Sequence, residues 1–158
     1  MNIFILDRDI ETNVKYYYDK HVIKMILEYT QILSTVCRLN GIDMGYKKTH
    51  TKHPSIKWTL KSKSNYIYLK ALTKALHEEW QYRFNHTKNH KSYDVMLTLP
   101  VPDIEDKGLT KFKAVMPDEY ITDDIVKSYR DYYICEKSHL AEWTGRKAPS
   151  WFIKGQLL

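Results

Sequence analysis

Apolar positions recur at intervals of three and four residues from Thr12 to Arg38. This spacing is typical of a helix that buries one face, so we predict one long amphipathic helix over this stretch. The apolar side chains that carry the pattern are Val14, Tyr18, Val22, Met25, Ile26, Tyr29, Ile32, Leu33 and Val36. Asn40-Gly41 follows, a common pair at helix C-termini, and we expect the helix to end there.

A row of polar side chains follows one margin of that apolar face. Its members lie three or four residues apart and therefore stack along one side of the helix: Tyr17, His21, Lys24, Glu28 and Gln31. Ionisable groups at the edge of a core tend to have shifted pKa values, and proton chemistry can be carried out there. The simpler interpretation is a solvated helix edge with one local salt bridge, and helix geometry alone favours it.

The rest of the chain predicts further helices and little strand. A short helical turn begins at Pro54, a second long helix spans Ser64 to Phe84, and a third opens at Thr122-Asp123-Asp124 and ends near Trp143. Residues 85–121 have no clear periodicity, and a loop of this length usually contacts a substrate or partner. We predict a compact all-α fold of three long helices with irregular loops, in one domain over residues 1–158.

The charge balance indicates a partner class. The chain has 25 Lys and Arg against 19 Asp and Glu, a net charge of +6. Excess positive charge favours polyanions through counterion release, so nucleic acid is the leading partner class. Thirteen tyrosines offer ring faces with polar tips, which suit wet surfaces and nucleobases. Lysine greatly outnumbers arginine, as in AT-rich genomes, so codon use explains part of the basic bias.

The cysteines and the first residues indicate a compartment. Cys37 and Cys135 form no CxxC pair and are interpreted as small core residues, so nothing requires an oxidising environment. The apolar run Ile3–Leu6 is too short for a signal peptide or a membrane span. We expect a soluble cytoplasmic protein, in the host cytoplasm if a phage encodes it.

Two histidine pairs, His50-x2-His53 and His86-x3-His90, have a spacing that could hold a zinc ion. No cysteine accompanies them and neither pair lies on a predicted helix, so we expect solvated loop histidines, no metal and no cofactor. The sequence also has no P-loop and no GxSxG motif, which excludes phosphate-cradle kinases and α/β hydrolases.

His21 and Glu28 are the pair in the polar row that could carry chemistry. They are seven residues apart, nearly superposed around the helix and two turns apart along it. Apolar neighbours tend to raise the pKa of a carboxyl group, and Lys24 opposes that effect. A carboxylate in such a place can stabilise an oxocarbenium-like sugar or activate water at a glycosidic carbon.

The spacing of this pair resembles the first helix of the phage pyrimidine-dimer DNA glycosylase/abasic lyase family, of the endonuclease V type. That family has Gln-His and then six residues before its catalytic Glu, and here Lys20-His21 precedes Glu28 at the same spacing. Two later stretches resemble the family in the same order: its second helix with a terminal turn, here Arg83-Phe84-Asn85, and its Pro-x-Trp-aromatic tail, here Pro149-Ser150-Trp151-Phe152. The chain is also similar to phage-encoded proteins that share Asp19-Lys20-His21-Val22.

The resemblance implies an all-α glycosylase fold, a role in DNA repair, Glu28 as the catalytic carboxylate and His21 as its neighbour in the pocket. The family's nucleophile is the α-amine of a threonine exposed by removal of methionine, whereas Met1-Asn2 here favours retention of methionine. The family's arginines beside its Glu are absent from this chain, so the lyase step is not carried over. Lys24, one turn before Glu28, is an alternative amine.

We therefore predict a DNA glycosylase, or a related base-excising or base-modifying hydrolase, that acts at the N-glycosidic bond of a base flipped out of duplex DNA. Glu28 stabilises the sugar cation or positions the nucleophile, and His21 orients or transfers a proton. The predicted DNA contacts are Lys20, Tyr17, Gln31, Lys47, Lys48, Lys52, Arg83, Arg130, Arg146, Lys147 and Trp151. We expect a monomer without a membrane partner. A non-catalytic protein that binds DNA or a host protein, and a small enzyme on free nucleotides, are the alternatives.

Overall fold

The computed structural model describes residues 1–153, and every regular element within them is a helix. The order is α1 (Ile10–Tyr16), α2 (Asp19–Leu39), α3 (Pro54–Lys61), α4 (Lys63–Phe84), α5 (Lys91–Thr98), the 3-10 turn η1 (Asp118–Tyr120), α6 (Ile125–Lys137) and the 3-10 turn η2 (Ser138–Leu140). The predicted all-α class is confirmed. The predicted single domain runs on to Leu158, and residues 154–158 of it lie outside the described part.

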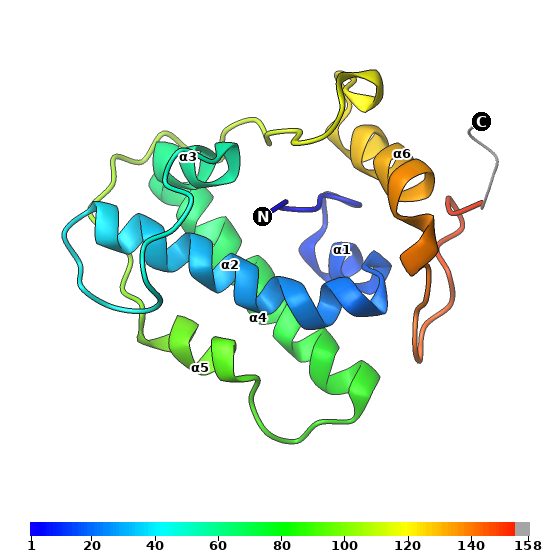
Figure 1. Cartoon of the computed structure of the whole chain (residues 1–158), viewed down its shortest axis with the longest axis horizontal. Helices are drawn as coiled ribbons and strands as arrows, with labels where there is room; N and C mark the ends of the chain where they lie inside the picture. The colour runs from blue at the N-terminus through cyan, green and yellow to red at the C-terminus, as the bar shows by residue number, and fades with distance from the viewer. Residues whose placement is uncertain (154–158) are drawn as a thin grey trace.

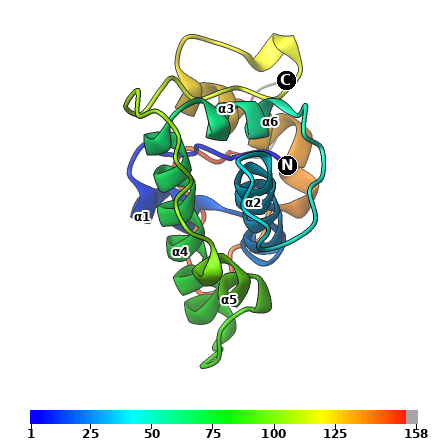
Figure 2. The ribbon, with the colours of Figure 1, turned by 90° about the vertical axis from the view of Figure 1, so that its left-hand side faces the viewer.

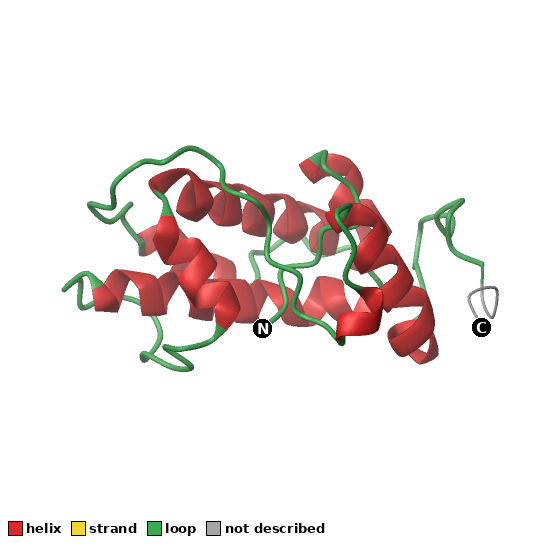
Figure 3. Ribbon diagram, turned by 90° about the horizontal axis from the view of Figure 1, so that it is seen from above, coloured by secondary structure: helices red, strands yellow, loops and turns green. Residues whose placement is uncertain are grey.

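The two longest helices, α2 and α4, pack against each other through the middle of the molecule (Figure 1). Figure 2 shows α3 and α5 on opposite sides of this pair, each in contact with both helices. The extended N-terminal segment enters the centre of the molecule, where Ile3–Leu6 is buried. Seen from above, helices and loops account for the whole described chain (Figure 3).

Tyrosine fills much of the core. Six tyrosines have no more than 2% of their surface exposed: Tyr17, Tyr18, Tyr29, Tyr66, Tyr129 and Tyr133. Their hydroxyls find partners, as a buried hydroxyl must. Tyr17 Oη, for example, lies 2.6 Å from Tyr29 Oη and donates to the Phe4 carbonyl at 2.9 Å. The expectation that the many tyrosines serve a wet or base-stacking surface is therefore wrong for these six.

The predicted helix from Thr12 to Arg38 is interrupted. Tyr17 and Tyr18 adopt extended conformations, with ψ values of 138° and 151°, and separate α1 from α2. The break exposes the last carbonyl groups of α1, which need donors from outside the helix. Arg83 of α4 supplies them, with hydrogen bonds to the carbonyls of Val14, Lys15 and Tyr17. A contact from far along the chain thus stabilises a break that local periodicity does not reveal.

Two other boundaries differ from the prediction. Residues 85–121 contain α5, whose N-cap His90 accepts the Ser92 N–H through Nδ1 at 3.1 Å. The last helix ends at Lys137 and continues only as the turn η2, so the prediction that it reaches Trp143 is wrong. Trp143 instead packs beside Tyr18 and donates its indole N–H to the Tyr16 carbonyl. The second long helix is confirmed as α4 and ends at Asn85 in the left-handed conformation.

Within residues 1–153, no helix combines the length and the apolar character needed to cross a membrane.

Candidate active site

The N-terminal segment is held in place at Phe4. Its N–H donates to Tyr29 Oη at 3.2 Å, and its carbonyl accepts from Asn13 and Tyr17, both at 2.9 Å. Its ring stacks on His21, with centroids 4.5 Å apart and an angle of 19° between the planes. These contacts fix a residue three positions from the start of the chain, so the first amine has a defined place beside α2.

That amine meets Glu28. The Met1 α-nitrogen lies 2.9 Å from Glu28 Oε1, and the two side chains are 8% and 13% exposed. Lys24 Nζ lies 3.4 Å from Oε2, on a side chain that is 69% exposed. Glu28 therefore has an amine at each carboxylate oxygen, one sheltered by the protein and one in solvent.

The ionisation of Glu28 follows from these neighbours. Burial raises its pKa, but the N-terminal ammonium group and Lys24 lower it further than burial raises it. The net pKa is below the ordinary value of a glutamate, so the group is a carboxylate at neutral pH. The expected raised pKa from the apolar neighbours is thus outweighed by the two amines.

His21 is held as a neutral ring. Its Nδ1 lies 2.6 Å from Tyr133 Oη, which itself accepts the Tyr18 N–H at 3.2 Å. The Tyr133 hydroxyl proton can then be donated to Nδ1 of a neutral ring that is protonated on Nε2. Burial lowers the pKa of His21 to about 4, with Lys137 and Lys24 acting in the same direction. A ring fixed in this way suits positioning of Phe4 better than transfer of protons.

His53 also belongs to the surroundings of this site. It precedes α3, and its Nδ1 accepts the Ser55 N–H at 3.0 Å, so the neutral ring carries its proton on Nε2. Burial lowers its pKa, and the N-terminal amine and His50 add to that effect, while Glu28 opposes it. No pattern in the sequence connects His53 with Glu28, because the two residues share neither a helix nor a local motif.

The predicted DNA contacts separate into two groups. Exposed or half-exposed side chains without a core role are Lys20, Gln31, Lys47, Lys48, Lys52 and Lys147. Tyr17 and Arg83 are not on the surface: Tyr17 is fully buried, and the Arg83 side chain is enclosed by the α1–α2 junction, Glu79 and Asp19. Helical periodicity misplaced Tyr17 because the helix breaks there, and a charged Arg83 looked exposed because its partners lie far away in sequence.

Arg130, Arg146 and Trp151 have structural partners as well. Arg130 donates to the Leu6 carbonyl and lies over the Trp151 ring at 5.2 Å. Arg146 forms a two-point contact with Glu79, at 3.0 and 2.8 Å. Trp151 is half-buried and contacts Tyr16 edge-on. These contacts favour the interpretation that the basic and aromatic tail holds the C-terminal segment against the body of the protein.

Among residues 1–153 there is no group of three or more His, Cys, Asp or Glu side chains placed to hold a metal ion. In the same part of the chain, the charged groups in contact with Glu28 are two amines, the Met1 α-amine and the Lys24 side chain. An amine beside an ionised carboxylate can lose its proton to that carboxylate and attack an electrophilic carbon. This defines a site suited to nucleophilic or oxocarbenium chemistry, the class to which DNA glycosylases belong.

Comparison with known proteins agrees with that class. Residues 1–92 match the family described as pyrimidine dimer DNA glycosylase, which is more than half of the 158 residues. The chain therefore belongs to the pyrimidine dimer DNA glycosylase family, and the predicted resemblance is confirmed. The matched region contains Met1, His21, Glu28 and His53. Neither the curated proteins nor the solved structures provide a significant match.

Proposed function

We propose that this protein is a DNA glycosylase in which Glu28 and the α-amine of Met1 act together on the N-glycosidic bond of a flipped base. The observation that carries the proposal is the 2.9 Å contact between that amine and Glu28 Oε1, both largely sheltered from solvent. Membership of a DNA glycosylase family supports DNA as the substrate. The net positive charge supports a polyanionic partner.

The proposed reaction begins with transfer of a proton from the ammonium group to Glu28. The free amine attacks C1′ of the sugar, and a C1′–N bond to the amine forms as the C1′–N bond to the base breaks. The base leaves with the bonding electron pair and takes up the proton held by Glu28. The sugar ring then opens as a second amine proton moves to the ring oxygen O4′, and the product is a protonated imine. Glu28, again ionised, stabilises the positive charge that develops at the sugar.

Met1 is a better candidate for this nucleophile than Lys24. The Met1 nitrogen is closer to the carboxylate, at 2.9 Å against 3.4 Å, and its side chain is far less exposed, 8% against 69%. A retained methionine therefore places its own amine at Glu28, and Lys24 is not needed as the nucleophile.

In this proposal His21 is a positioning residue. Its stacking on Phe4 holds the segment that carries the Met1 amine, and Tyr133 fixes the ring. His53, with its Nε2–H directed away from the α3 backbone contact, is a donor available to the substrate. Lys24 contributes positive charge that keeps Glu28 ionised.

The test is borohydride trapping on duplex DNA that contains a thymine dimer, an abasic site or a modified pyrimidine. We expect a covalent adduct that maps to Met1. Glu28→Gln should lower the trapping rate roughly a hundredfold or more, with DNA affinity little changed. Glu11→Gln on the exposed surface of α1 is the matched control and should trap normally.

Other results would contradict the proposal in distinct ways. An adduct on Lys24 or Lys20 would reassign the nucleophile, and replacement of that lysine by glutamine would then abolish trapping. Alkali-labile breaks without any adduct would indicate that Glu28 activates water instead of an amine. Binding without base release on every substrate would favour the non-catalytic alternative.

A further inference from the structure

Residues 109–114 form an extended segment that buried side chains of three helices hold by its backbone. Trp58 Nε1 of α3 donates to the Lys111 carbonyl at 2.8 Å. Asn65 Oδ1 of α4 accepts the Thr110 N–H at 3.0 Å. Tyr129 Oη of α6 donates to the Lys113 carbonyl at 3.0 Å. The segment has no regular secondary structure, yet its position is determined by the core.

This anchoring leaves two lysine side chains in solvent. Lys111 and Lys113 flank Phe112 in this segment, and both lysines are exposed whereas Phe112 is half-buried. Phe112 packs against Trp58 and Tyr68, with ring centroids 5.4 and 5.0 Å apart. The backbone of the segment and Phe112 contact buried side chains, whereas Lys111 and Lys113 are exposed to solvent.

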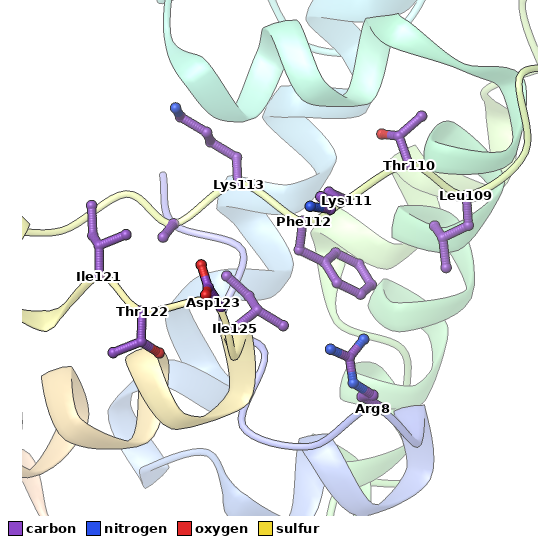
Figure 4. A pocket seen from close by; sticks show the side chains of 11 residues that line it. Arg8, Leu109, Thr110, Lys111, Phe112, Lys113, Ile121, Thr122, Asp123 and Ile125 are labelled. Atoms are coloured by element: carbon purple, nitrogen blue, oxygen red, sulfur yellow. The ribbon is translucent and has the colours of Figure 1, made fainter.

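A cleft of about 550 Å³ separates this segment from the turn before α6. Figure 4 shows Arg8, Lys111 and Lys113 around it, with Thr122 and Asp123 on the turn. The remaining lining is largely apolar: Leu109, Phe112, Ile121 and Ile125. Three cationic residues and one carboxylate border an apolar floor, and the Lys113 side chain extends away from the Thr122–Asp123 turn (Figure 4). The cleft therefore suits an anionic ligand that also has an uncharged, carbon-rich part.

The positive charge continues on the other side of the segment. A second hollow of about 470 Å³ lies between it and α3, lined by Lys57 and Lys61 together with Lys111 and Lys113. Within residues 1–153 these four lysines and Arg8 form no ion pair with a carboxylate. Five unpaired cations therefore lie along one connected surface, the 111–113 ridge with a hollow on each flank.

The ridge lies next to the Met1–Glu28 site. A small gap is lined by Ile3, Ser55 and Lys113, together with Trp58 and Phe112. Ile3 is two residues from Met1, and Ser55 is two residues from His53. Tyr129 also joins the two regions, because its hydroxyl lies 2.9 Å from Asn2 Oδ1 as well as 3.0 Å from the Lys113 carbonyl. A strand whose target base enters the site would pass this ridge.

We propose that the 111–113 ridge, with Arg8, Lys57 and Lys61, binds the phosphodiester backbone of the DNA strand that flanks the target base. The inference rests on the proposed function and extends the DNA contact beyond the residues matched by the family, which end at position 92. The cations face the phosphates, and the apolar floor of the Arg8 cleft faces the deoxyribose carbons. This assigns a role to the loop between α5 and α6.

A repeating phosphate backbone fits these features better than a single small anion does. The five cations belong to three separate stretches of chain and face two hollows, so one phosphate cannot reach them all. A DNA strand carries a charge at each nucleotide and an apolar sugar face between charges. Phosphate contacts of this kind position a duplex without selecting sequence.

The test compares Lys111→Gln/Lys113→Gln with Lys88→Gln/Lys91→Gln. The control pair has the same charge change and lies at the α4–α5 connection, across the α2–α4 pair from α3 (Figure 2). Binding to duplex DNA is measured from low to high salt. Each lost phosphate contact lowers the magnitude of the slope of log affinity against log salt by about 0.9. For the ridge variant this slope should therefore fall by nearly two, and the affinity at moderate salt should fall about tenfold. For Arg8→Gln, on the opposite wall of the cleft, the slope should fall by about one.

The outcome separates this inference from the proposed function. With saturating protein, the ridge variant should still form the borohydride adduct, because Met1 and Glu28 are unchanged. The wild-type protein could form neither adduct nor free base while the ridge variant shows the reduced slope of log affinity against log salt. In that case the ridge binds DNA and the proposed chemistry fails. If the ridge variant and Arg8→Gln keep the slope of the control pair, the ridge does not bind DNA and the inference is overturned.

Discussion

His21 and Glu28 lie two turns apart on α2, yet their surroundings push them toward opposite charge states. Glu28 is kept ionised by the Met1 amine and Lys24. His21 is kept neutral by burial, with Phe4 on its face and Tyr133 on its Nδ1. A carboxylate can act on a substrate in this arrangement, whereas the imidazole contributes through the position of the N-terminal segment.

The neutral state of His21 predicts acid sensitivity. Its pKa falls from 6.5 to about 4 on folding, so the folded protein takes up this proton less readily than the unfolded chain does. Its contribution to stability is therefore fully present above pH 6.5 and is lost as the pH falls toward 4, by about 3 kcal/mol in all. Urea denaturation at a series of pH values measures this loss.

The matched variant for this measurement is His21→Asn. Burial lowers the pKa of His77 and His90 as well, so those residues contribute to the acid sensitivity of both proteins. The difference between wild type and variant in the loss of stability from pH 6.5 to 4 gives the contribution of His21. Equal losses of stability between pH 6.5 and 4 in the two proteins would refute the assignment.

At the scale of elements, the junction between α1 and α2 is the feature with the greatest structural consequence. It turns the chain at Tyr17 and Tyr18 and places both rings in the core. Arg83 makes this turn possible, since its guanidinium binds three backbone carbonyls and is neutralised by Glu79 and Asp19. A charge with so many partners is costly to remove, because its partners remain buried.

Replacement of Arg83 by Met should therefore destabilise the protein strongly. We expect the free energy of unfolding to fall by about 3–5 kcal/mol, the usual loss when one partner of a buried ionic network is removed. Chemical denaturation followed by circular dichroism measures it. Arg146→Met removes a partly exposed contact to the same Glu79 and should cost clearly less. Similar losses for the two variants would show that the guanidinium at the junction has no special role.

At the scale of the whole molecule, the part of the chain beyond position 92 encloses the N-terminal segment. Tyr129 on α6 is the main connection, because its hydroxyl contacts Asn2 and Lys113 and accepts the Val115 N–H at 3.3 Å. The N-terminal segment, the ridge and α6 are thus joined through one buried group. The geometry of the proposed site depends on residues that the family match does not include.

Tyr129→Phe tests this connection. Loss of the hydroxyl leaves buried groups without a partner and should lower the free energy of unfolding by about 1–3 kcal/mol. It should also slow base release at saturating DNA, because a small displacement of the amine from Glu28 weakens alignment with the sugar. Tyr82→Phe, at an exposed tyrosine, is the control and should change neither property. Normal turnover in a destabilised Tyr129→Phe protein would show that α6 does not position the amine.

Much of the fold follows from local pattern. The positions of α3 and α4 agree closely with the sequence prediction, because the apolar spacing and the residues at the helix ends point to the same boundaries. The sequence pattern does not reveal α5, because this helix has eight residues and buries only Ser92 and Met96. The spacing of His21 and Glu28 likewise came from the sequence, since both residues lie on one helix.

The features that follow from the sequence alone depend on residues close together in the chain. They are the all-α class, the excess of positive charge, and a carboxylate and an imidazole two turns apart in an arrangement that resembles a DNA glycosylase family. The packing of the helices was needed to show which amine meets Glu28, that Arg83 and Tyr17 are interior, and that Lys113 lies beside Ile3 of the N-terminal segment. Each of these depends on contacts between residues distant in the chain. Helical periodicity records the direction of a side chain from its own helix, and it contains no information on what another segment brings to that place.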